Sequence, residues 1–215
     1  MHTIYFYKDK NGNEPVLDYM RELASQKSKD SRIKLNKLND YIELLSQHGT
    51  RAGEPYMKYL EDEIWELRPL RDRVLFVAWV DGSFVLLHHF VKKTQKTPRR
   101  EIEKAKRELK DVKEKGQVMN NSAIGSNWKD VRSELFTKEE ILESDMRVAI
   151  MSELIEARHE QGISQKKLEE LSGMSQPVIA RMETGKTSPQ LDTVLKVLAS
   201  LGKTLAVVPL EQRKS

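Results

Sequence analysis

A pair of short helices joined by a tight turn is encoded by residues 162–185, GISQKKLEELSGMSQPVIARMETG. Ser164 is placed to cap the first helix through its hydroxyl. Leu168 and Leu171, three positions apart, are expected to supply the inward face of that helix. Gly173 lies in the turn, where it can take the positive φ that a sharp reversal of the chain needs. These features predict an αα unit with fixed ends.

The second helix of this pair has its own start and stop signals. Ser175 is expected to cap it, and Pro177 is tolerated in the first turn because amide groups there lack helical partners. Ile179 and Met182 are spaced to point back to the core. Gly185 is expected to end the helix. The spacing as a whole is that of a helix-turn-helix, whose second helix enters the major groove of DNA.

The outward face of the second helix carries groups that read bases. Gln pairs with adenine and Arg with guanine through two hydrogen bonds each, which assigns such roles to Gln176 and Arg181. The alternative is an ordinary αα-hairpin without a DNA partner. The segment Glu183-Thr-Gly-Lys-Thr-Ser-Pro189 and the capping serines resemble the repressor-type (XRE/Cro-like) helix-turn-helix family, which implies operator DNA as partner. The expected DNA-binding residues are Gln165, Ser175, Gln176, Pro177, Arg181 and Lys186.

Length and composition fit a protein of two small domains. The chain has 215 residues, of which 38% are hydrophobic and 33% charged, and it contains no cysteine, so disulfides and thiolate metal sites are excluded. The first residues lack the long apolar core of a signal peptide. The longest apolar run, residues 74–80, is too short to cross a membrane. We therefore expect a cytoplasmic protein without a membrane partner.

Charge is distributed unevenly along the chain. Residues 1–118 hold 24 Lys and Arg against 19 Asp and Glu, whereas residues 119–215 hold 13 against 14. The larger positive balance therefore lies outside the helix-turn-helix half. This indicates an anionic partner for the first half, although a solvated basic surface would give the same count.

The first half reads as a small α+β domain, an antiparallel sheet with helices packed against it. Asp81-Gly82 is a strong hairpin signal between two strands. Thr97-Pro98 is expected to start a helix with Ile102, Ala105, Leu109 and Val112 inward. The expected strands are 4–8, 56–60, 63–70, 73–80 and 83–91. Two further helices are expected. One starts at Pro15 with Val16, Met20, Leu23 and Ala24 inward, and the other spans 31–46 with Ile33, Leu38, Tyr41, Ile42 and Leu45 inward.

The second half begins after a predicted linker, residues 116–127, which is rich in Gly, Ser and Asn. Residues 128–160 read as helical and acidic, and we expect the acidic helix over 134–156 to neutralise the basic first domain. An all-α helix-turn-helix domain follows. Its last helix is expected to bury Leu191, Val194, Leu195 and Leu198. A C-terminal strand is expected over 203–210, and its pairing with a second copy would give a homodimer.

Cationic side chains are concentrated on the strands of the first half. Arg, Lys and one His beside a sheet suit a phosphodiester, since cations hold the phosphate and a His or Lys can move protons. RNA carries its own 2′-hydroxyl nucleophile, so cleavage without a metal or other cofactor favours RNA. His88 and His89 are adjacent and should point to opposite faces of a strand, which argues against a shared metal. The alternatives are a structural ion pair between Arg68 and Glu66, a packed His88 and a solvated lysine edge.

A family resemblance covers the first half. Trp65-Glu-Leu-Arg68, Arg73-Val-Leu-Phe and Leu87-His-His-Phe-Val-Lys-Lys-Thr-Gln-Lys-Thr-Pro98 resemble the HigB branch of the RelE/ParE toxins (Gp49-like). Residues 122–210 resemble the partner antitoxin HigA. The order of the two halves is the usual order of the two genes. The resemblance implies a HigB-like toxin domain over 1–115 and a HigA-like antitoxin domain over 128–215.

The activity that this resemblance implies is ribosome-dependent endonucleolytic cleavage of mRNA. The second half would neutralise the toxin and repress its own promoter. Arg68 and Arg73 would stabilise the phosphate, His89 or Lys93 would transfer protons, and Lys58 would hold RNA together with Lys92 and Lys96. One alternative is a DNA-binding regulator with a catalytically inactive toxin-like domain. Another is a toxin that acts on gyrase, as ParE-like relatives do.

Overall fold

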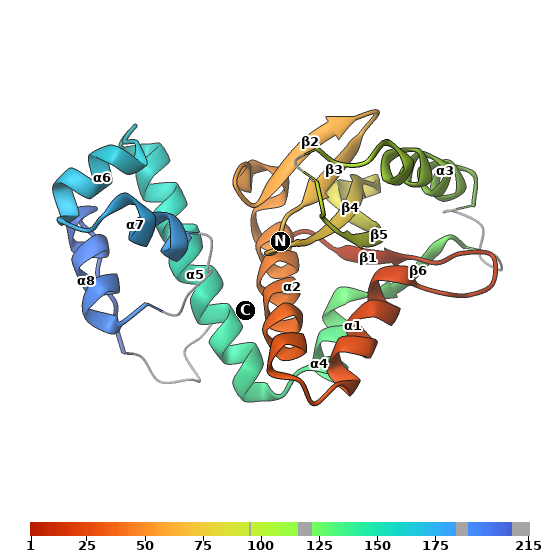
Figure 1. Ribbon diagram of the computed structural model, residues 1–215, viewed down its shortest axis with the longest axis horizontal. Helices are drawn as coiled ribbons and strands as arrows, with labels where there is room; N and C mark the ends of the chain where they lie inside the picture. Colours follow the sequence, from red (N-terminus) through yellow and green to blue (C-terminus); the bar gives the residue numbers. More distant parts are fainter. Residues whose placement is uncertain (95, 116–121, 184–188, 208–215) are drawn as a thin grey trace. The chain divides into compact units, whose positions relative to one another are not determined.

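The computed structural model describes residues 1–94, 96–115, 122–183 and 189–207, apart from the side chains at positions 158, 159 and 165. Contacts divide the chain into two compact units, Met1–Val148 and Ala149–Ser215. Figure 1 shows the sheet and its helices in the first unit and a helical second unit. The predicted α+β half followed by a helical half is confirmed.

The first unit contains a six-stranded mixed sheet in the order β2-β3-β4-β5-β1-β6. The antiparallel pairing that the sequence predicts holds for every adjacent pair except β1 and β5, which run parallel. Two parallel neighbours need a long crossover connection between them. Here the connection from β1 to β5 includes the two helices that lie between β1 and β2. The strands are β1 (Ile4–Tyr7), β2 (Met57–Glu61), β3 (Ile64–Leu67), β4 (Asp72–Ala78), β5 (Phe84–Val91) and β6 (Ile124–Asn127).

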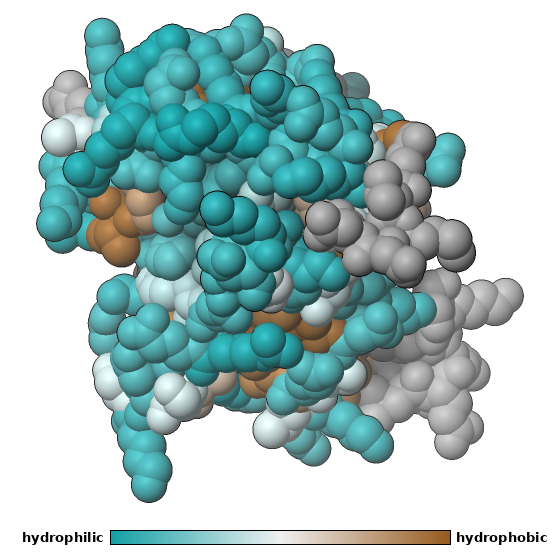
Figure 2. Space-filling model, turned by 90° about the vertical axis from the view of Figure 1, so that its right-hand side faces the viewer, coloured by the Kyte–Doolittle hydropathy of each residue, from teal (hydrophilic) through white to brown (hydrophobic). Residues whose placement is uncertain are grey.

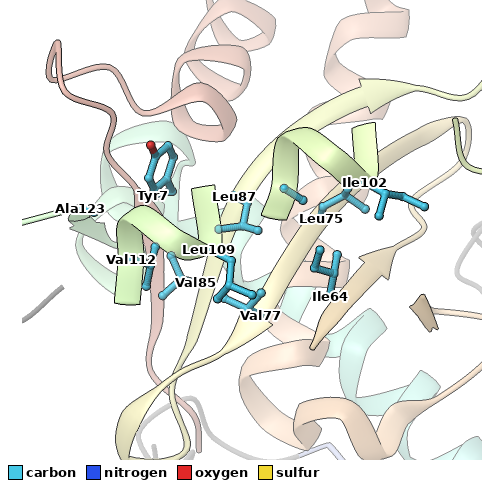
Figure 3. Close-up of a cluster of buried hydrophobic side chains, with 11 residues drawn as sticks. Tyr7, Ile64, Leu75, Val77, Val85, Leu87, Ile102, Leu109, Val112 and Ala123 are labelled. Carbon is cyan, nitrogen blue, oxygen red and sulfur yellow. The ribbon is translucent and has the colours of Figure 1, made fainter. Parts of the chain in front are cut away.

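Helix α3 (Arg99–Lys115) covers one face of this sheet. Figure 3 shows its apolar side chains packed on those of the strands, with Leu75, Val77 and Leu87 opposite the helix. The four α3 positions predicted to face inward, Ile102, Ala105, Leu109 and Val112, are all buried. This confirms the prediction, because a helical period of about 3.6 places such positions on one face.

Further helices complete the first unit. They are α1 (Pro15–Ser25), α2 (Lys29–His48), α4 (Trp128–Leu135) and the first part of α5 (Lys138–Glu160), with short 3₁₀ turns at Gly49–Ala52 and Val80–Gly82. Two predicted inward positions are wrong, since Ala24 and Ile33 are exposed. Leu17 of α1 is buried although the sequence analysis did not select it. Each apolar face is therefore rotated slightly from its predicted position.

The predicted linker over 116–127 is wrong for its last four residues. Residues 116–121 lie outside the described part, but Ile124–Asn127 forms β6 and pairs antiparallel with β1. Asn127 then caps α4 by accepting a hydrogen bond from the Lys129 amide at 2.8 Å. This segment is thus part of the first unit, where it extends the sheet by one strand.

The second unit contains the end of α5, α6 (Gln165–Ser172), α7 (Gln176–Glu183) and α8 (Leu191–Ser200). The Ser164 hydroxyl accepts a hydrogen bond from the Lys167 amide at 3.1 Å, which confirms the predicted cap of α6. Gly173 takes the left-handed conformation with φ of +67° and so makes the turn before α7 possible. Leu168, Ile179 and Met182 are buried in the core, as predicted.

Several predictions for the second unit are wrong. Leu171, Leu191 and Leu195 are exposed rather than inward, because Leu168 of α6 and Val194, Val197 and Leu198 of α8 fill the small core. Residues 203–207 have no regular secondary structure, so the predicted C-terminal strand is not formed there, and 208–210 lie outside the described residues. Gly185 and Lys186 also lie outside them.

The face of the molecule in Figure 2 is mostly hydrophilic, with smaller hydrophobic areas, in keeping with a chain that is one third charged. Among the described residues, none of the helices combines the length and apolar character that crossing a membrane requires.

Candidate nucleic-acid interfaces

Three cationic side chains of the first unit converge on one buried carboxylate. Glu66 is 1% exposed, and its Oε1 lies 3.3 Å from Arg73 Nε, 3.5 Å from Arg68 Nε and 3.9 Å from Lys92 Nζ. The Thr97 hydroxyl donates a hydrogen bond to the other carboxylate oxygen. We refer to Arg68, Arg73 and Lys92 as the cationic cluster. Arg68 also contacts the exposed Glu54 carboxylate, and the three positive charges still exceed these two negative charges, which suits a phosphate.

The sheet topology explains why these residues meet. Glu66 is on β3, Arg68 follows that strand, Arg73 is on the adjacent β4, and Lys92 follows β5, the next strand along. Lys58 on the edge strand β2 is the register partner of Glu66. Four neighbouring strands, β2 to β5, therefore bring side chains that are distant in sequence to one place.

Burial affects the charged groups of the cationic cluster. Desolvation lowers the pKa of the Arg73 guanidinium and of the Lys92 ammonium, and the nearby Glu66 carboxylate opposes this in both. The Arg73 side chain is only 10% exposed, and its Nη1 donates to the backbone oxygens of Leu70 at 3.0 Å and Asp72 at 2.6 Å. Arg73 is thus held in one orientation, whereas Arg68 is 25% exposed.

The remaining predicted lysines are exposed. The Lys58 ammonium lies 3.8 Å from Glu54 Oε1, and Arg68 Nη1 lies 3.4 Å from the other oxygen of the same carboxylate. Lys93 and Lys96 are both exposed. The structure therefore gathers Lys58, Arg68, Arg73 and Lys92, and leaves Lys93 and Lys96 on the solvated segment that follows β5.

The two adjacent histidines face opposite sides of the sheet, as predicted. His88 is fully buried against α3, where its Nδ1 is 2.5 Å from Glu108 Oε2 and its Nε2 is 3.4 Å from Glu101 Oε2. His89 instead stacks on Tyr19 of α1. His88 is thus a packed core histidine, which was one of the alternatives left open by the sequence.

His89 is not brought to the cationic cluster. On β5 its register partner is Val74, whereas the partner of Arg73 is Phe90, and consecutive strand positions point to opposite faces. Burial lowers the pKa of His89 to about 4, against a smaller opposing effect of a backbone hydrogen bond with Pro15. His89 is therefore a neutral imidazole on the α1 side of the sheet.

Glu66 and Thr97 belong to this candidate site but were not among the predicted site residues. The sequence suggested only an ion pair of Glu66 with Arg68, which the structure contains, and gave Thr97 the role of starting α3. A charged residue between the apolar Trp65 and Leu67 on a strand was the available signal, because a buried carboxylate requires cationic or hydrogen-bonding partners.

The second candidate interface is the exposed side of α7. Ser175 directly before the helix, Gln176 and Pro177 in its first turn and Arg181 in its last turn are all exposed, as base and phosphate contacts require. The Gln165 side chain and Lys186 lie outside the described residues. Among those described, no group of three or more His, Cys, Asp or Glu is placed to hold a metal ion.

These two structures, an α+β unit with a cationic cluster and a helical unit with an exposed second helix, agree with the families that the chain matches. Residues 22–110 match the family "Phage derived protein Gp49-like (DUF891)", and residues 154–208 match the helix-turn-helix family. The prediction that a Gp49-like half is joined to a helix-turn-helix half is confirmed, which fits a fused toxin–antitoxin chain.

Individual relatives agree with the match of residues 154–208 to the helix-turn-helix family. The chain is 55% identical over 94 residues to an "Uncharacterized HTH-type transcriptional regulator" of Haemophilus influenzae, covering 44% of this chain and 96% of that protein. It is 38% identical over 63 residues to the transcriptional regulator PuuR of Escherichia coli, covering 29% of this chain and 34% of PuuR. The chain therefore belongs to the helix-turn-helix transcriptional regulators.

A solved structure titled "Toxin-Antitoxin module from Streptococcus pneumoniae" is 93% identical to this chain where the two align. The alignment covers 41% of this chain and 98% of that one, with a TM-score of 0.39.

Proposed function

We propose that the chain is a type II toxin–antitoxin protein of the HigB and HigA type. Residues 1–115 act as a ribosome-dependent mRNA endonuclease, and the residues after 121 neutralise it and bind operator DNA to repress its synthesis. The partners are mRNA on the ribosome, operator DNA and a second copy of the chain through the helix-turn-helix half. A reaction on the ribosome places the protein in the cytoplasm.

The observation that carries this proposal is the position of the residues that precede the helix-turn-helix unit. Strand β6, helix α4 and the start of α5 pack into the first unit, where β6 extends its sheet. A DNA-binding domain alone does not need such a segment. Its close packing on a Gp49-like domain supports a role in holding that domain inactive.

The cationic cluster supports cleavage of a phosphodiester. Arg68, Arg73 and Lys92 would hold the phosphate and offset the charge that develops on its oxygens. The 2′-oxygen of the RNA attacks phosphorus and loses its proton to a base, while the bond to the 5′-oxygen breaks and that oxygen takes up a proton. Of the two predicted proton-transfer residues, Lys93 directly follows Lys92 and is exposed, whereas His89 is half-buried on the other side of the sheet. We therefore assign the donation of a proton to the 5′-oxygen to the Lys93 ammonium, while solvent takes the proton of the 2′-hydroxyl.

Expression of residues 1–118 in bacteria, with and without residues 119–215 in trans, tests the proposal. Growth arrest with new cleavage sites inside translated messages, mapped by primer extension and relieved by the second half, is the expected result. Arg73→Ala should abolish the arrest. Arg99→Ala is the matched control, because Arg99 is exposed and pairs with Glu61 and Glu103 away from the cationic cluster. Arrest with intact messages would instead indicate another target, such as gyrase.

A second candidate function is a transcriptional regulator with an inactive toxin-like domain. The observation that favours it is the engagement of Arg73, whose guanidinium already contacts Glu66 and two backbone oxygens. Normal growth and intact transcripts with folded residues 1–118 would support this function over the endonuclease.

A further inference from the structure

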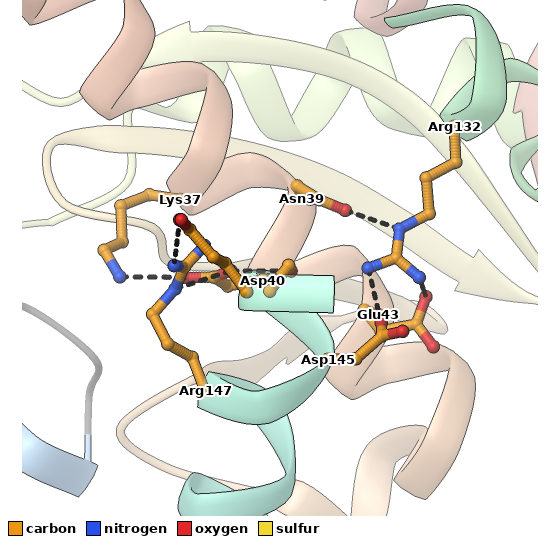
Figure 4. A network of polar contacts seen from close by, with 9 residues as sticks. Lys37, Asn39, Asp40, Glu43, Arg132, Asp145 and Arg147 are labelled. Carbon is orange, nitrogen blue, oxygen red and sulfur yellow. Dashed lines mark hydrogen bonds and ion pairs between the residues drawn. The ribbon is translucent and has the colours of Figure 1, made fainter. Parts of the chain in front are cut away.

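The segment from Ala123 to Arg147 contacts the rest of the first unit through buried polar groups. We propose, building on the function proposed above, that residues 122–148 are the neutralising element, separable from the helix-turn-helix unit. We further propose that Asp40 and Glu43 of α2 are the residues that recognise it. Figure 4 shows these two acidic side chains with the arginines of α4 and α5 directed toward them.

Asp40 is the centre of the first contact. It is fully buried, and four donors reach its carboxylate. The Ser144 hydroxyl donates at 2.7 Å, Arg147 donates through Nε at 3.0 Å and Nη2 at 3.0 Å, and the Lys37 ammonium donates at 2.8 Å. Only the lysine belongs to the same helix. A segment that covered Asp40 without supplying such donors would remove water from the carboxylate without replacing the lost hydrogen bonds. Asp40 therefore discriminates between segments that carry these donors and segments that do not.

Glu43, one turn along α2, is the centre of the second contact. Its Oε2 lies 3.1 Å from Arg132 Nη1 and accepts a hydrogen bond from the Trp128 indole at 3.3 Å. Arg132 is 11% exposed, and its Nε also donates to Asn39 at 2.8 Å. The guanidinium therefore contacts two residues of α2 at once, through Nη1 and through Nε, because its donors are fixed in a planar fork.

Strand β6 provides the third contact. The Ser126 amide donates to Glu14 Oε1 at 2.8 Å. At the preceding position, a Cβ on Gly125 would lie 2.1 Å from the same oxygen and 3.0 Å from the Phe6 carbonyl. Glycine is thus required at position 125 for as long as Glu14 keeps this position.

An exposed ion pair spans the same boundary and offers a control. Arg21 Nη2 lies 3.5 Å from Glu134 Oε2, but the two side chains are 51% and 60% exposed. Exposed pairs contribute little, since both charges keep most of their water. Arg21 and Arg132 therefore test the same charge at the same boundary in exposed and buried settings.

The experiment uses the full chain with a protease site inserted between residues 118 and 119. After purification, each variant is checked by circular dichroism and cleaved, and the dissociation constant of the two pieces is measured with one fluorophore on each. We expect the wild-type pieces to remain associated. Arg147→Ala and Arg132→Ala should each weaken association by about 100-fold, and Arg21→Ala by less than about threefold.

Three further variants separate a loss of recognition from misfolding. Gly125→Ala should weaken association, and adding Glu14→Ala should restore part of the lost affinity, because the shorter side chain removes the contact with the Glu14 carboxylate and leaves only that with the Phe6 carbonyl. Leu168→Asp, in the core of the helix-turn-helix unit, should leave association unchanged.

Three results would overturn the proposal: separation of the wild-type pieces, equal effects of Arg147→Ala and Arg21→Ala, or a loss with Leu168→Asp as large as that with Arg147→Ala. Growth of cells that express the uncleaved variants reports the proposed function separately. Variants that loosen association without arresting growth would contradict the toxin, while recognition by Asp40 and Glu43 would stand.

Discussion

The imidazole of His89 lies parallel to the phenol ring of Tyr19, with ring centroids 3.7 Å apart and an interplanar angle of 8°. The Tyr19 hydroxyl in turn donates a hydrogen bond to Asp72 Oδ1 at 2.8 Å. These contacts join α1 to β4 and β5 on the side of the sheet away from α3. They give His89 a structural role and predict a particular dependence of stability on pH.

The first prediction is that stability falls in mild acid because of His89. Burial lowers its pKa to about 4 in the folded chain. The unfolded chain, with a histidine pKa of about 6.5, takes up a proton first as the pH falls, so the free energy of unfolding decreases between these two values. His89→Phe keeps a stacking ring and removes this titration. Because the side chain is only partly buried, we expect the decrease to shrink by about 1–2 kcal/mol.

Urea unfolding of both proteins between pH 4 and pH 7 measures this difference. Asp72 acts in the opposite direction, since burial raises the pKa of its carboxyl and the folded chain then holds the proton more tightly. Other charged neighbours that act on His89 are His88, Lys104 and Glu101. All are present in both proteins, so comparison at each pH cancels their contributions to first order. Parallel curves for wild type and His89→Phe would contradict the prediction.

The second prediction concerns Glu66, on which the cationic cluster depends. In Glu66→Gln the charges of Arg68, Arg73 and Lys92 lose their common counter-charge, and Arg73 is nearly buried. We expect the free energy of unfolding to fall by about 2–4 kcal/mol, as for a buried ion pair that loses one partner. Glu61→Gln is the control, because Glu61 pairs with Arg99 and Lys106 at the surface and should have little effect. Equal effects of the two substitutions would show that the cationic cluster does not need its carboxylate.

The third prediction tests the cationic cluster on RNA. Arg73→Ala in the full chain should weaken binding of a fluorescent RNA oligonucleotide by about tenfold and lower the salt dependence by about one phosphate contact. Arg99→Ala removes an exposed arginine of the same unit and should leave both quantities near the wild-type values. Fluorescence anisotropy at several salt concentrations gives both. If the two variants bind alike, the cationic cluster is not the RNA site.

Local patterns in the sequence predicted those parts of the fold that local physics determines. The buried face of α3, the Ser164 cap and the left-handed Gly173 each follow from spacing or from one residue's conformational range. Residues 124–127 could not be predicted in this way. Ile-Gly-Ser-Asn has no strand pattern, and it becomes β6 because β1 offers an unpaired edge. That information lies elsewhere in the chain.

The candidate site shows the same division. Arg68, Arg73 and Lys92 were predicted as site residues, and the order of the strands brings them together. His89 was predicted with them, but the alternation of β5 directs it to the other face. A register shift between β4 and β5 near Leu75 also lies in this region, and such a shift cannot be predicted from spacing.

The fourth prediction concerns Gly173, which makes the turn between α6 and α7. Its φ of +67° is strained for any residue with a Cβ, although no atom lies within 4 Å of where that Cβ would be. Gly173→Ala should therefore lower the stability of the second unit by about 1 kcal/mol through backbone strain alone. Gly12→Ala, at φ of +85° and also without close neighbours, is the control for the first unit. Thermal unfolding by calorimetry should assign each loss to a different unit.

The fifth prediction is that α7 reads DNA through Gln176 and Arg181. Both side chains are exposed on the helix that follows the Gly173 turn. Replacing either by Ala should cost about 1–3 kcal/mol on the preferred operator and relax selectivity at one base pair, because each removes a two-bond contact to a base edge. Selection of binding sites from a random DNA library by the full chain supplies the operator, and mobility-shift titration then measures the loss. Arg100→Ala removes an exposed arginine of α3 in the other unit and should leave operator affinity unchanged. An equal loss on every DNA sequence would assign these side chains to the phosphate backbone instead of the bases.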